Sequence, residues 1–353
     1  MRRRVEHLRG LGKLAVEATK GVTELVQEMQ GAIGGAPARI LTAPVYASIK
    51  GVTSVIGGAL DLALGQASSL LEESSNPAET GVVLAALNGV LGDYLADTKS
   101  SLAIEMRAHP VDRAKATSKV LLFVHGSSMN HASWKGAREL GYTPLFVDYN
   151  SGLHISTNGR RLAALLDEIV SGWPLPVEEI AIIAHSMGGL VTRSACHYAE
   201  ERPHLWRAKL RAIVFIGTPH HGAMLERGGN WIETILGVTR YSAPFARLAK
   251  IRSAGVTDLR FGNVIDDHWK GTDRFALETD VRSPVPLPND VACYAVAAEK
   301  DALVPFASAM GEHANSELNL GFPADRRFIA KGMGHVGVLS DESVWEQVER
   351  WLR

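Results

Sequence analysis

Cysteine is scarce in this chain of 353 residues, which has only Cys196 and Cys293. Two cysteines so far apart exclude the dense disulfide framework that holds small secreted domains together. An excess of charge of one sign is also missing, because 37 lysines and arginines stand against 38 aspartates and glutamates. Since the chain has no positive field to attract phosphates, we do not expect nucleic acid as a partner.

Long hydrophobic runs are absent as well. No stretch of about 18 uncharged apolar residues occurs, so we expect no membrane-spanning helix. Three arginines follow Met1, but Glu6, His7 and Arg9 stand where a signal peptide needs an uninterrupted apolar stretch. The sequence therefore predicts no secretory signal and a cytoplasmic protein.

The first hundred residues have the periodicity of helices. Apolar residues recur at steps of three and four over 11–33, 45–64 and 83–95, a spacing typical of amphipathic helices. We expect residues 1–98 to form an all-helical region. We expect this region to pack against the rest of the protein, and to help either to shape a binding site or to form a homo-oligomer.

From about residue 99 the pattern changes to alternating strands and helices. Leu102, Ile104 and Met106 alternate with other residues at the period of a strand. Apolar runs typical of buried parallel strands follow at 120–124, 144–147, 180–183, 212–216, 292–296 and 327–330. Helical patterns separate some of these runs, and another closes the chain. This alternation predicts an α/β fold with a doubly wound, mostly parallel sheet over residues 99–353.

One interruption of this domain, from about residue 223 to 288, is too long for an ordinary loop. It contains Trp231, Ile235 and Leu248 among other apolar residues at helix-like steps. We expect this insert to fold as a helical cap. A cap covers the mouth of a pocket, so Trp231 is a candidate for substrate contact.

The most informative segment is Ala184-His185-Ser186-Met187-Gly188, which follows the apolar run Ile180–Ile183 and opens a helical pattern. A sharp strand-to-helix turn presents a serine as a nucleophile, and its crowded backbone needs small residues two positions before and after the serine. Here alanine takes the first of these positions and glycine the second. The context predicts Ser186 as a nucleophile.

A serine hydroxyl needs a histidine to accept its proton and a carboxylate to orient that histidine. When the chain order is serine, acid, histidine, both partners follow later strands. Asp301 follows the run at 292–296, and His335 follows the run at 327–330 within a glycine-rich loop. We favour these two residues. The alternatives are Glu299 and Asp148 for the acid, and His220, His221 and His313 for the base.

The tetrahedral oxyanion formed in such a reaction needs backbone donors held in place. The N–H of Met187, directly after the serine, is one expected donor. His125-Gly126-Ser127 follows the run at 120–124, and the Ser127 N–H is the expected second donor. His125 and Met129, in and after this turn, are candidates for substrate contact.

The sequence predicts no metal site and no cofactor. His220 and His221 are adjacent, but successive residues seldom converge on one ion, and no carboxylate or cysteine stands at ligand spacing from them. A structural turn is the favoured interpretation of this pair.

We call the strand-to-helix turn Ala184–Gly188 the elbow. Over about residues 100 to 353 the chain resembles the α/β-hydrolase superfamily. The resemblance rests on the elbow, His125-Gly126, Gly217-Thr218-Pro219-His220-His221-Gly222, Asp301 and His335. Within this superfamily, the elbow is similar to that of small bacterial lipases. The segment from Gly217 to Gly222 resembles the lipase and GPI inositol-deacylase-like branch. The resemblance implies the same triad and the same oxyanion donors. It also implies hydrolysis of small-molecule or lipid acyl esters.

Three functions follow as hypotheses. The first is a serine carboxylic-ester hydrolase, an esterase or lipase, acting through an acyl-enzyme on an apolar acyl ester. The second is a thioesterase or amidase, because the same triad attacks all three kinds of carbonyl. The third is a lipid-surface or scaffold protein that works through its N-terminal helices. Segment 41–71 is amphipathic, but Lys50 and Asp61 are its only charges, whereas interfacial helices are rich in lysine and arginine.

Overall fold

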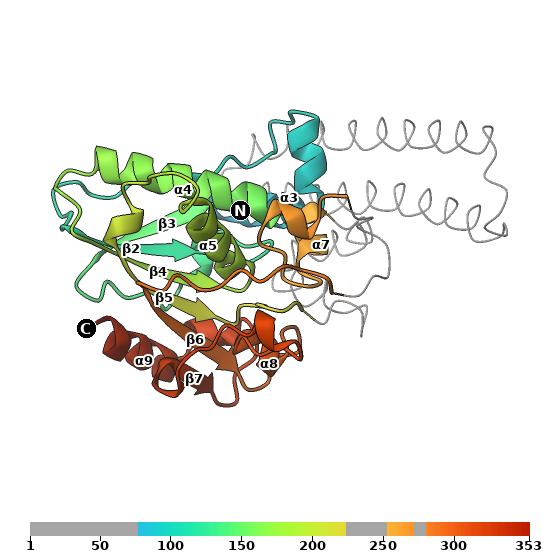
Figure 1. Cartoon of the computed structure of the whole chain (residues 1–353). Helices are drawn as coiled ribbons and strands as arrows, with labels where there is room; N and C mark the ends of the chain where they lie inside the picture. Colours follow the sequence, from blue (N-terminus) through green and yellow to red (C-terminus); the bar gives the residue numbers. More distant parts are fainter. Residues whose placement is uncertain (1–76, 224–252, 272–279) are drawn as a thin grey trace, which may run out of the picture.

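The computed structural model describes residues 77–223, 253–271 and 280–353. Its centre is a seven-stranded sheet in the order β1-β3-β2-β4-β5-β6-β7 (Figure 1). The strands are β1 (Arg107–Ala108), β2 (Lys119–Val124), β3 (Thr143–Asp148), β4 (Glu179–His185), β5 (Leu210–Ile216), β6 (Ala292–Ala298) and β7 (Arg327–Ala330). β1 runs antiparallel to β3, and every other neighbouring pair is parallel. This confirms the predicted α/β class with a doubly wound, mostly parallel sheet, the architecture of the α/β-hydrolase fold.

The central strands β2, β4 and β5 are largely apolar and buried, as expected where both faces of a sheet are covered. In β2 every residue from Val120 to Val124 is 0% exposed. Its side chains divide between two cores, with Leu122 in one and Phe123 in the other. The alternation of successive side chains across a strand explains why one run supplies both cores.

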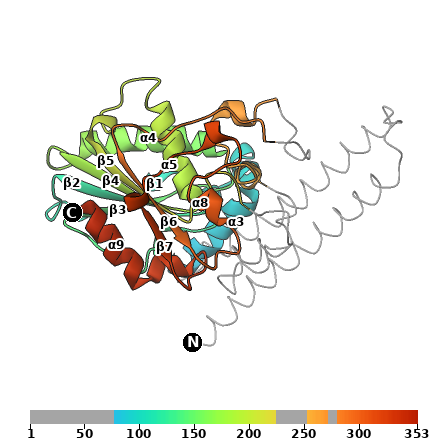
Figure 2. The ribbon, with the colours of Figure 1, turned by 60° about the horizontal axis from the view of Figure 1, so that its bottom comes forward.

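Helices cover the two faces of the sheet (Figure 2). The longer helices and short helical turns around the sheet are α4 (Ile155–Gly172), α5 (Met187–Tyr198), α8 (Phe306–Ala309) and α9 (Glu342–Leu352). Leu162 and Leu166 of α4 belong to one core, and Trp345 of α9 belongs to the other. No helix among the described residues is long and apolar enough to span a membrane.

Helix α3 (Pro77–Asp97) is the described part of the predicted helical region. It approaches two loops at the carboxyl ends of the strands, and two of its glycines allow the contact. A Cβ on Gly89 would lie 1.9 Å from Ser128 Oγ, and one on Gly92 would lie 1.8 Å from Asn150 Oδ1. The Asn150 side chain also donates to the Gly92 carbonyl at 2.8 Å. Helix α3 is therefore packed against the sheet domain rather than separate from it.

The segment around Leu102 is not the strand that its alternation suggests. Residues 101–106 are turn and irregular structure, and β1 contains only the two residues that follow. The Asn88 side chain of α3 donates to the Leu102 carbonyl at 2.7 Å and accepts from the Ile104 N–H at 2.9 Å. Because α3 occupies these backbone groups, the segment does not extend the sheet.

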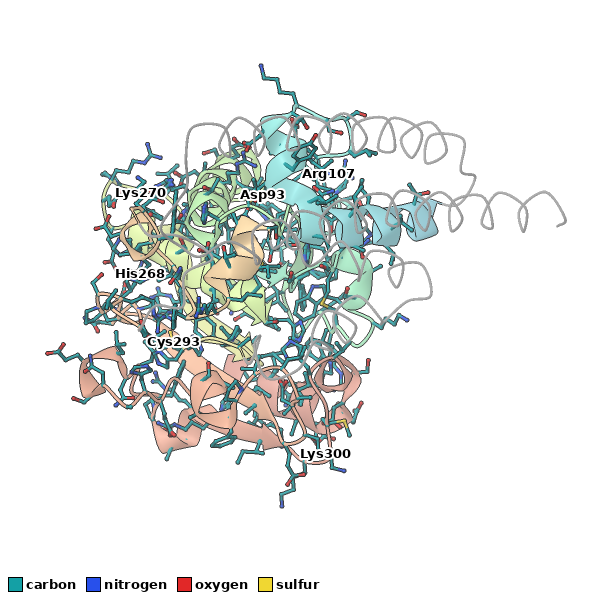
Figure 3. The ribbon with its side chains drawn as sticks, turned by 90° about the vertical axis from the view of Figure 1, so that its right-hand side faces the viewer. Asp93, Arg107, His268, Lys270, Cys293 and Lys300 are labelled. Carbon is teal, nitrogen blue, oxygen red and sulfur yellow. The ribbon has the colours of Figure 1, made fainter. Side chains whose placement is uncertain are left out.

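The described part of the predicted cap insert packs on α3. It contains the short helix α7 (Ala254–Asp258). Ser253 Oγ donates to the Gly89 carbonyl at 2.7 Å, and the Ala254 N–H donates to Asp93 Oδ2 at 2.9 Å. Asp93 of α3 is labelled in Figure 3. Residues 1–76, 224–252 and 272–279, which include Trp231 and most of the apolar steps of the insert, lie outside the described residues.

Candidate active site

Ser186 stands at the sharp turn between β4 and α5. Its backbone has φ 52° and ψ −124°, a left-handed conformation that costs a residue with a side chain about 1–3 kcal/mol. Its N–H donates to the Ile216 carbonyl of β5 at 2.9 Å, which helps to hold the turn. A Cβ on Gly188 would lie 2.3 Å from the Val124 carbonyl oxygen. Glycine is needed there because α5 begins against the end of β2.

The structure brings His335 and Asp301 to this serine. His335 Nε2 lies 2.9 Å from Ser186 Oγ, and His335 Nδ1 lies 2.7 Å from Asp301 Oδ2. Asp301 follows β6, and His335 follows β7. The side chains of His335 and Asp301 are 5% and 4% exposed, and Ser186 is 5% exposed as a residue, so the chain of hydrogen bonds is shielded from bulk water.

The Asp301 carboxylate is held from both sides. Burial raises its pKa, but hydrogen bonds from His335 and from the Val304 and Leu303 amides lower it more. The net pKa of Asp301 is therefore below its ordinary value. Asp301 Oδ1 accepts both amides at 2.9 Å, which leaves Oδ2 for the histidine. An ionised carboxylate in this position fixes the Nδ1–H tautomer and turns Nε2 toward the serine.

The alternative acids lie elsewhere. Glu299 Oε2 accepts the Gly332 N–H at 2.7 Å at an exposed position. Asp148, the last residue of β3, contacts the rings of His109 and His131. Neither carboxylate has a hydrogen bond to His335 among the described contacts, so Asp301 is the acid that the geometry favours.

The alternative histidines also lie away from the serine. His220 is 0% exposed, and its ring packs edge-on against Phe215 and at a tilt against Phe322. Burial lowers the pKa of His220 well below the usual value. His221 packs beside His313, with 5.0 Å between the ring centroids. Burial lowers the pKa of His221 to about 4.

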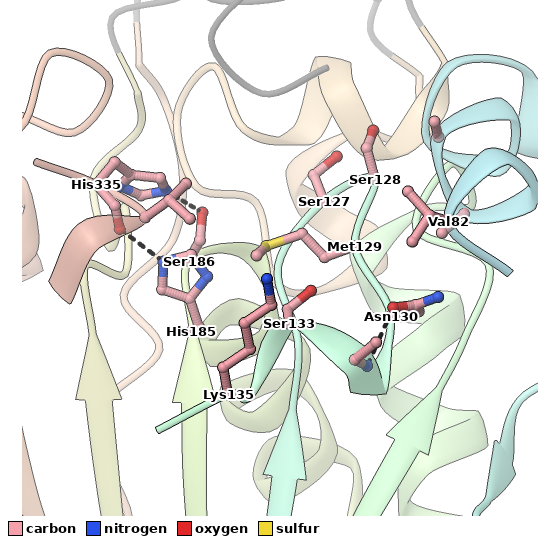
Figure 4. A pocket seen from close by; sticks show the side chains of 14 residues that line it. Val82, Ser127, Ser128, Met129, Asn130, Ser133, Lys135, His185, Ser186 and His335 are labelled. Atoms are coloured by element: carbon pink, nitrogen blue, oxygen red, sulfur yellow. Dashed lines mark hydrogen bonds between the residues drawn. The ribbon is translucent and has the colours of Figure 1, made fainter. Parts of the chain in front are cut away.

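His185 is a site residue that the sequence analysis did not select. Its Nε2 lies 3.0 Å from the His335 carbonyl oxygen, so this nitrogen carries the proton and donates it (Figure 4). Burial, followed by the field of His335, lowers the pKa of His185 to about 3. A neutral His185 therefore supports the loop that carries His335. The only sequence signal was its place directly before the serine.

The turn after β2 stands beside the elbow. A Cβ on Gly126 would lie 3.0 Å from His185 Nδ1 and 3.1 Å from Ser186 Cβ, which explains the glycine. The next residue, Ser127, lines the cavity described below, and its hydroxyl has no partner within the described ranges. Met187 is the first residue of α5 and is fully buried. Ser127 thus lines the same cavity as Ser186, and Met187 is the next residue in the chain; their roles as oxyanion donors stay predictions.

His125 does not line the cavity, contrary to its choice as a substrate contact. It is 1% exposed, its Nδ1 lies 2.8 Å from the Gly126 carbonyl oxygen, and its ring stacks on Tyr149 with 4.3 Å between centroids. The Tyr149 hydroxyl donates to the His125 carbonyl at 2.8 Å. Burial lowers the pKa of His125 to about 4. The residue supports the turn from behind.

A cavity of about 210 Å³ opens at Ser186 (Figure 4). Its wall combines helix α3, the turn after β2, the elbow and the loop after β7. Helix α3 contributes Val82, Ala85 and Ala86, and the turn after β2 contributes Met129. Met129 thus lies where a substrate contact was expected. A helix outside the predicted α/β domain supplies part of the cavity wall.

Comparisons with known proteins add the following. A family described as a domain of unknown function (DUF7379) matches residues 95–260. A search of curated proteins finds no match. Similar solved structures include the lipase BlEst2 from Bacillus licheniformis, at 20% identity and TM-score 0.43, covering 70% of this chain and 98% of that one. A lipase-esterase related protein from Clostridium acetobutylicum is 15% identical, with TM-score 0.42 and coverage of 70% and 99%. YbtT, a type II thioesterase from the yersiniabactin biosynthetic pathway, is 13% identical, with TM-score 0.44 and coverage of 70% and 97%.

Proposed function

We propose that the protein is a serine hydrolase that cleaves carboxylic esters through an acyl-enzyme. The observation that carries this proposal is the buried hydrogen-bond chain from Ser186 through His335 to Asp301 at a cavity. A serine becomes a useful nucleophile when a histidine within hydrogen-bond reach accepts its proton. The strained backbone of Ser186 supports the same proposal, since strain of this kind concentrates at functional sites.

In the first half of the reaction, Ser186 Oγ attacks the ester carbonyl carbon while His335 Nε2 takes the hydroxyl proton. The carbonyl π electrons move to the oxygen, and the N–H groups of Ser127 and Met187 stabilise the resulting anion. When the intermediate collapses, the C–O bond to the alcohol breaks and His335 returns the proton to the leaving oxygen. Asp301 stabilises the imidazolium throughout this half-reaction.

The second half-reaction repeats these steps with water. His335 removes a proton from water as the oxygen attacks the acyl carbon, and the same backbone donors hold the second oxyanion. Collapse then releases the carboxylic acid and returns the proton to Ser186. No step needs a metal ion or cofactor, because the chain supplies the nucleophile, the base and the donors.

The cavity favours a short acyl chain. Pockets for drug-sized ligands usually have volumes of about 300–1,000 Å³, whereas this cavity measures about 210 Å³. Val82, Ala85 and Ala86 give the α3 side an apolar wall. We therefore propose small esters with an apolar acyl group as the substrate class.

Three narrower proposals concern the substrate, the branch of the superfamily and lipid contact. A thioester or amide carbonyl suits the same three residues, so acyl-CoA and anilide substrates with matched acyl groups have to be compared with esters. The GPI inositol-deacylase-like branch rests on the segment from Gly217 to Gly222 alone. Peripheral lipid contact by the N-terminal helices draws no support from α3, because residues 85–92 of that helix are buried.

The direct test uses Ser186→Ala. With p-nitrophenyl butyrate we expect kcat to fall by a factor on the order of 10⁶, as for removal of a triad nucleophile. The matched control is Ser343→Ala, at an exposed serine near the start of α9, which should retain the wild-type rate. A fluorophosphonate probe should label the wild type at Ser186, as mapped by mass spectrometry. Normal turnover by Ser186→Ala, or labelling at another serine only, would contradict the proposal.

A further inference from the structure

A second cluster of reactive side chains lies near the β1 edge of the sheet, at the same carboxyl end of the parallel strands as Ser186. His109 follows β1 directly, Asp148 ends β3, and His131 begins the short helical turn η1 (His131–Ser133). The antiparallel register pairs Arg107 with Asp148 and Ala108 with Val147, so β1 and the residue that follows it run along the last three residues of β3. The His109 N–H also donates to the Phe146 carbonyl at 2.8 Å, so its position is fixed by the backbone.

The two histidine rings converge on one carboxylate oxygen. Asp148 Oδ2 lies 2.7 Å from His109 Nε2 and 2.9 Å from His131 Nδ1. The second oxygen, Oδ1, accepts the backbone N–H of His131 at 2.7 Å. The carboxylate is thus oriented by one oxygen, while the other faces two imidazole nitrogens. One ligand atom from each residue lies within 4.8 Å of the others.

We propose that His109, His131 and Asp148 bind a divalent transition-metal ion such as Zn²⁺. Two imidazole nitrogens and one carboxylate oxygen are a standard donor set for zinc, and three protein ligands leave a fourth position for water. Without an ion, both histidine rings would have to donate an N–H to the same oxygen, Asp148 Oδ2, while their centroids lie only 3.7 Å apart. A bound ion instead uses the lone pairs of both nitrogens and one of the oxygen. In the part of the chain that the structure describes, this is the one group with such an arrangement.

The site is open enough for an ion to enter. The side chains of His109 and His131 are 25% and 41% exposed, whereas that of Asp148 is 10% exposed. The carboxylate therefore forms the fixed base, and the two rings form the rim. The amide hydrogen bond to Oδ1 is the outer contact that orients a ligating carboxylate.

An ion at this position would connect the turn after β2 to the edge of the sheet. His131 lies in the same turn region as Met129 and Asn130, which line the cavity. A metal ion shared by His109, His131 and Asp148 would tie this region to the ends of β1 and β3. The inference is independent of ester hydrolysis, because it concerns binding and stability and uses none of the proposed catalytic residues.

The experiment titrates the full-length protein, dialysed against EDTA and then freed of chelator, with Zn²⁺ alone by calorimetry. We expect one tight equivalent in the wild type and an upward shift of Tm. His109→Gln and His131→Gln should each weaken this equivalent by more than about 100-fold, since loss of an outer partner alone costs 10–100-fold. His197→Gln is the matched control, because His197 pairs with only one carboxylate, at 4.0 Å. It should bind Zn²⁺ as the wild type does.

Two further measurements support the titration. Co²⁺ should give the wild type a visible absorption band that one equivalent of Zn²⁺ removes, and circular dichroism without metal reports whether each variant is folded. The proposal is overturned if the wild type binds no tight equivalent. It is equally overturned if folded His109→Gln and His131→Gln proteins bind Zn²⁺ as tightly as the wild type. Either result would leave the cluster as a hydrogen-bonded group only.

Discussion

The contact between α3 and the turn after β2 predicts a sharp response to Gly89→Ala. The new Cβ would lie 1.9 Å from Ser128 Oγ and 2.8 Å from Ser128 Cβ, where ordinary contacts begin at 3.4 Å. The hydroxyl can rotate away, but the Cβ can separate only if the backbone moves by roughly 0.6 Å. Such overpacking costs about 1–3 kcal/mol. The higher helix propensity of alanine offsets up to about 1 kcal/mol of this cost, so we expect a net destabilisation of roughly 0–3 kcal/mol.

Activity should fall as well as stability. Ser128 is next to Ser127, whose N–H is the proposed oxyanion donor, so a shift of this size moves the donor away from the developing charge. A misplacement of about 1 Å can cost 10²-fold in rate. For the smaller shift caused by Gly89→Ala, we expect about a tenfold loss of kcat/KM on p-nitrophenyl butyrate.

Ser128→Gly supplies the matching variant. It removes both clashing side-chain atoms, and Ser128 has φ 59°, a conformation that glycine adopts without strain. In a double-mutant cycle, urea unfolding of the four proteins should give a coupling energy of about 1–3 kcal/mol between the two sites. The double variant should also regain most of the lost activity. Additive effects on stability would refute the reasoning, because they would show that the contact is not the cause.

Three further predictions concern the site and its surroundings. Asp301→Asn should lower kcat by a factor on the order of 10⁴ with little change in KM, because an amide cannot hold His335 in the right tautomer; initial rates on p-nitrophenyl butyrate measure this. Ala86→Phe should lower kcat/KM for the hexanoate ester, relative to kcat/KM for the acetate ester, at least about tenfold, because the ring would fill the α3 side of the cavity. Equal losses on both esters would contradict the proposed apolar acyl wall. His220→Phe should stabilise the fold at pH 7.5 by about 1 kcal/mol, because the buried ring nitrogens have no partner in the described chain. Since burial lowers the pKa of folded His220, only the unfolded chain takes up its proton below about pH 6.5. The advantage of the variant in urea unfolding should therefore grow by up to about 1.4 kcal/mol per pH unit as the pH falls below that value.

The parallel strands explain why sequence reasoning located the candidate triad. The carboxyl ends of neighbouring parallel strands meet at one edge of a sheet, so residues directly after strand runs become neighbours in space. Ser186, Asp301 and His335 each follow such a run, and the structure brings them within hydrogen-bond distance. Their catalytic roles remain predictions, but their proximity follows from chain order and strand ends alone.

The spacing of apolar residues in the sequence could not predict how α3 is buried. Residues 85–92 of α3 are buried without a break, whereas an amphipathic pattern predicts one buried stripe. The helix is covered by the turn after β2 and by α7, two segments remote in sequence. Gly89 and Gly92 look like weak points in a helix, but they are the positions where neighbouring loops approach the helix axis. Only the tertiary contacts distinguish these two interpretations.

The proposed metal site could not be predicted from the sequence either. His109, His131 and Asp148 have no ligand spacing that a motif search recognises, and Asp148 had a ready interpretation as an alternative triad acid. What joins them is the antiparallel pairing of β1 with β3, together with a turn that returns His131 to the end of β3. The adjacent pair His220 and His221, for which the sequence favoured a structural turn over a metal site, packs in two different environments. When ligands come from two strands at a sheet edge, strand pairing determines whether they meet. In this protein the proposed metal site depends on the pairing of the two-residue strand β1 with β3.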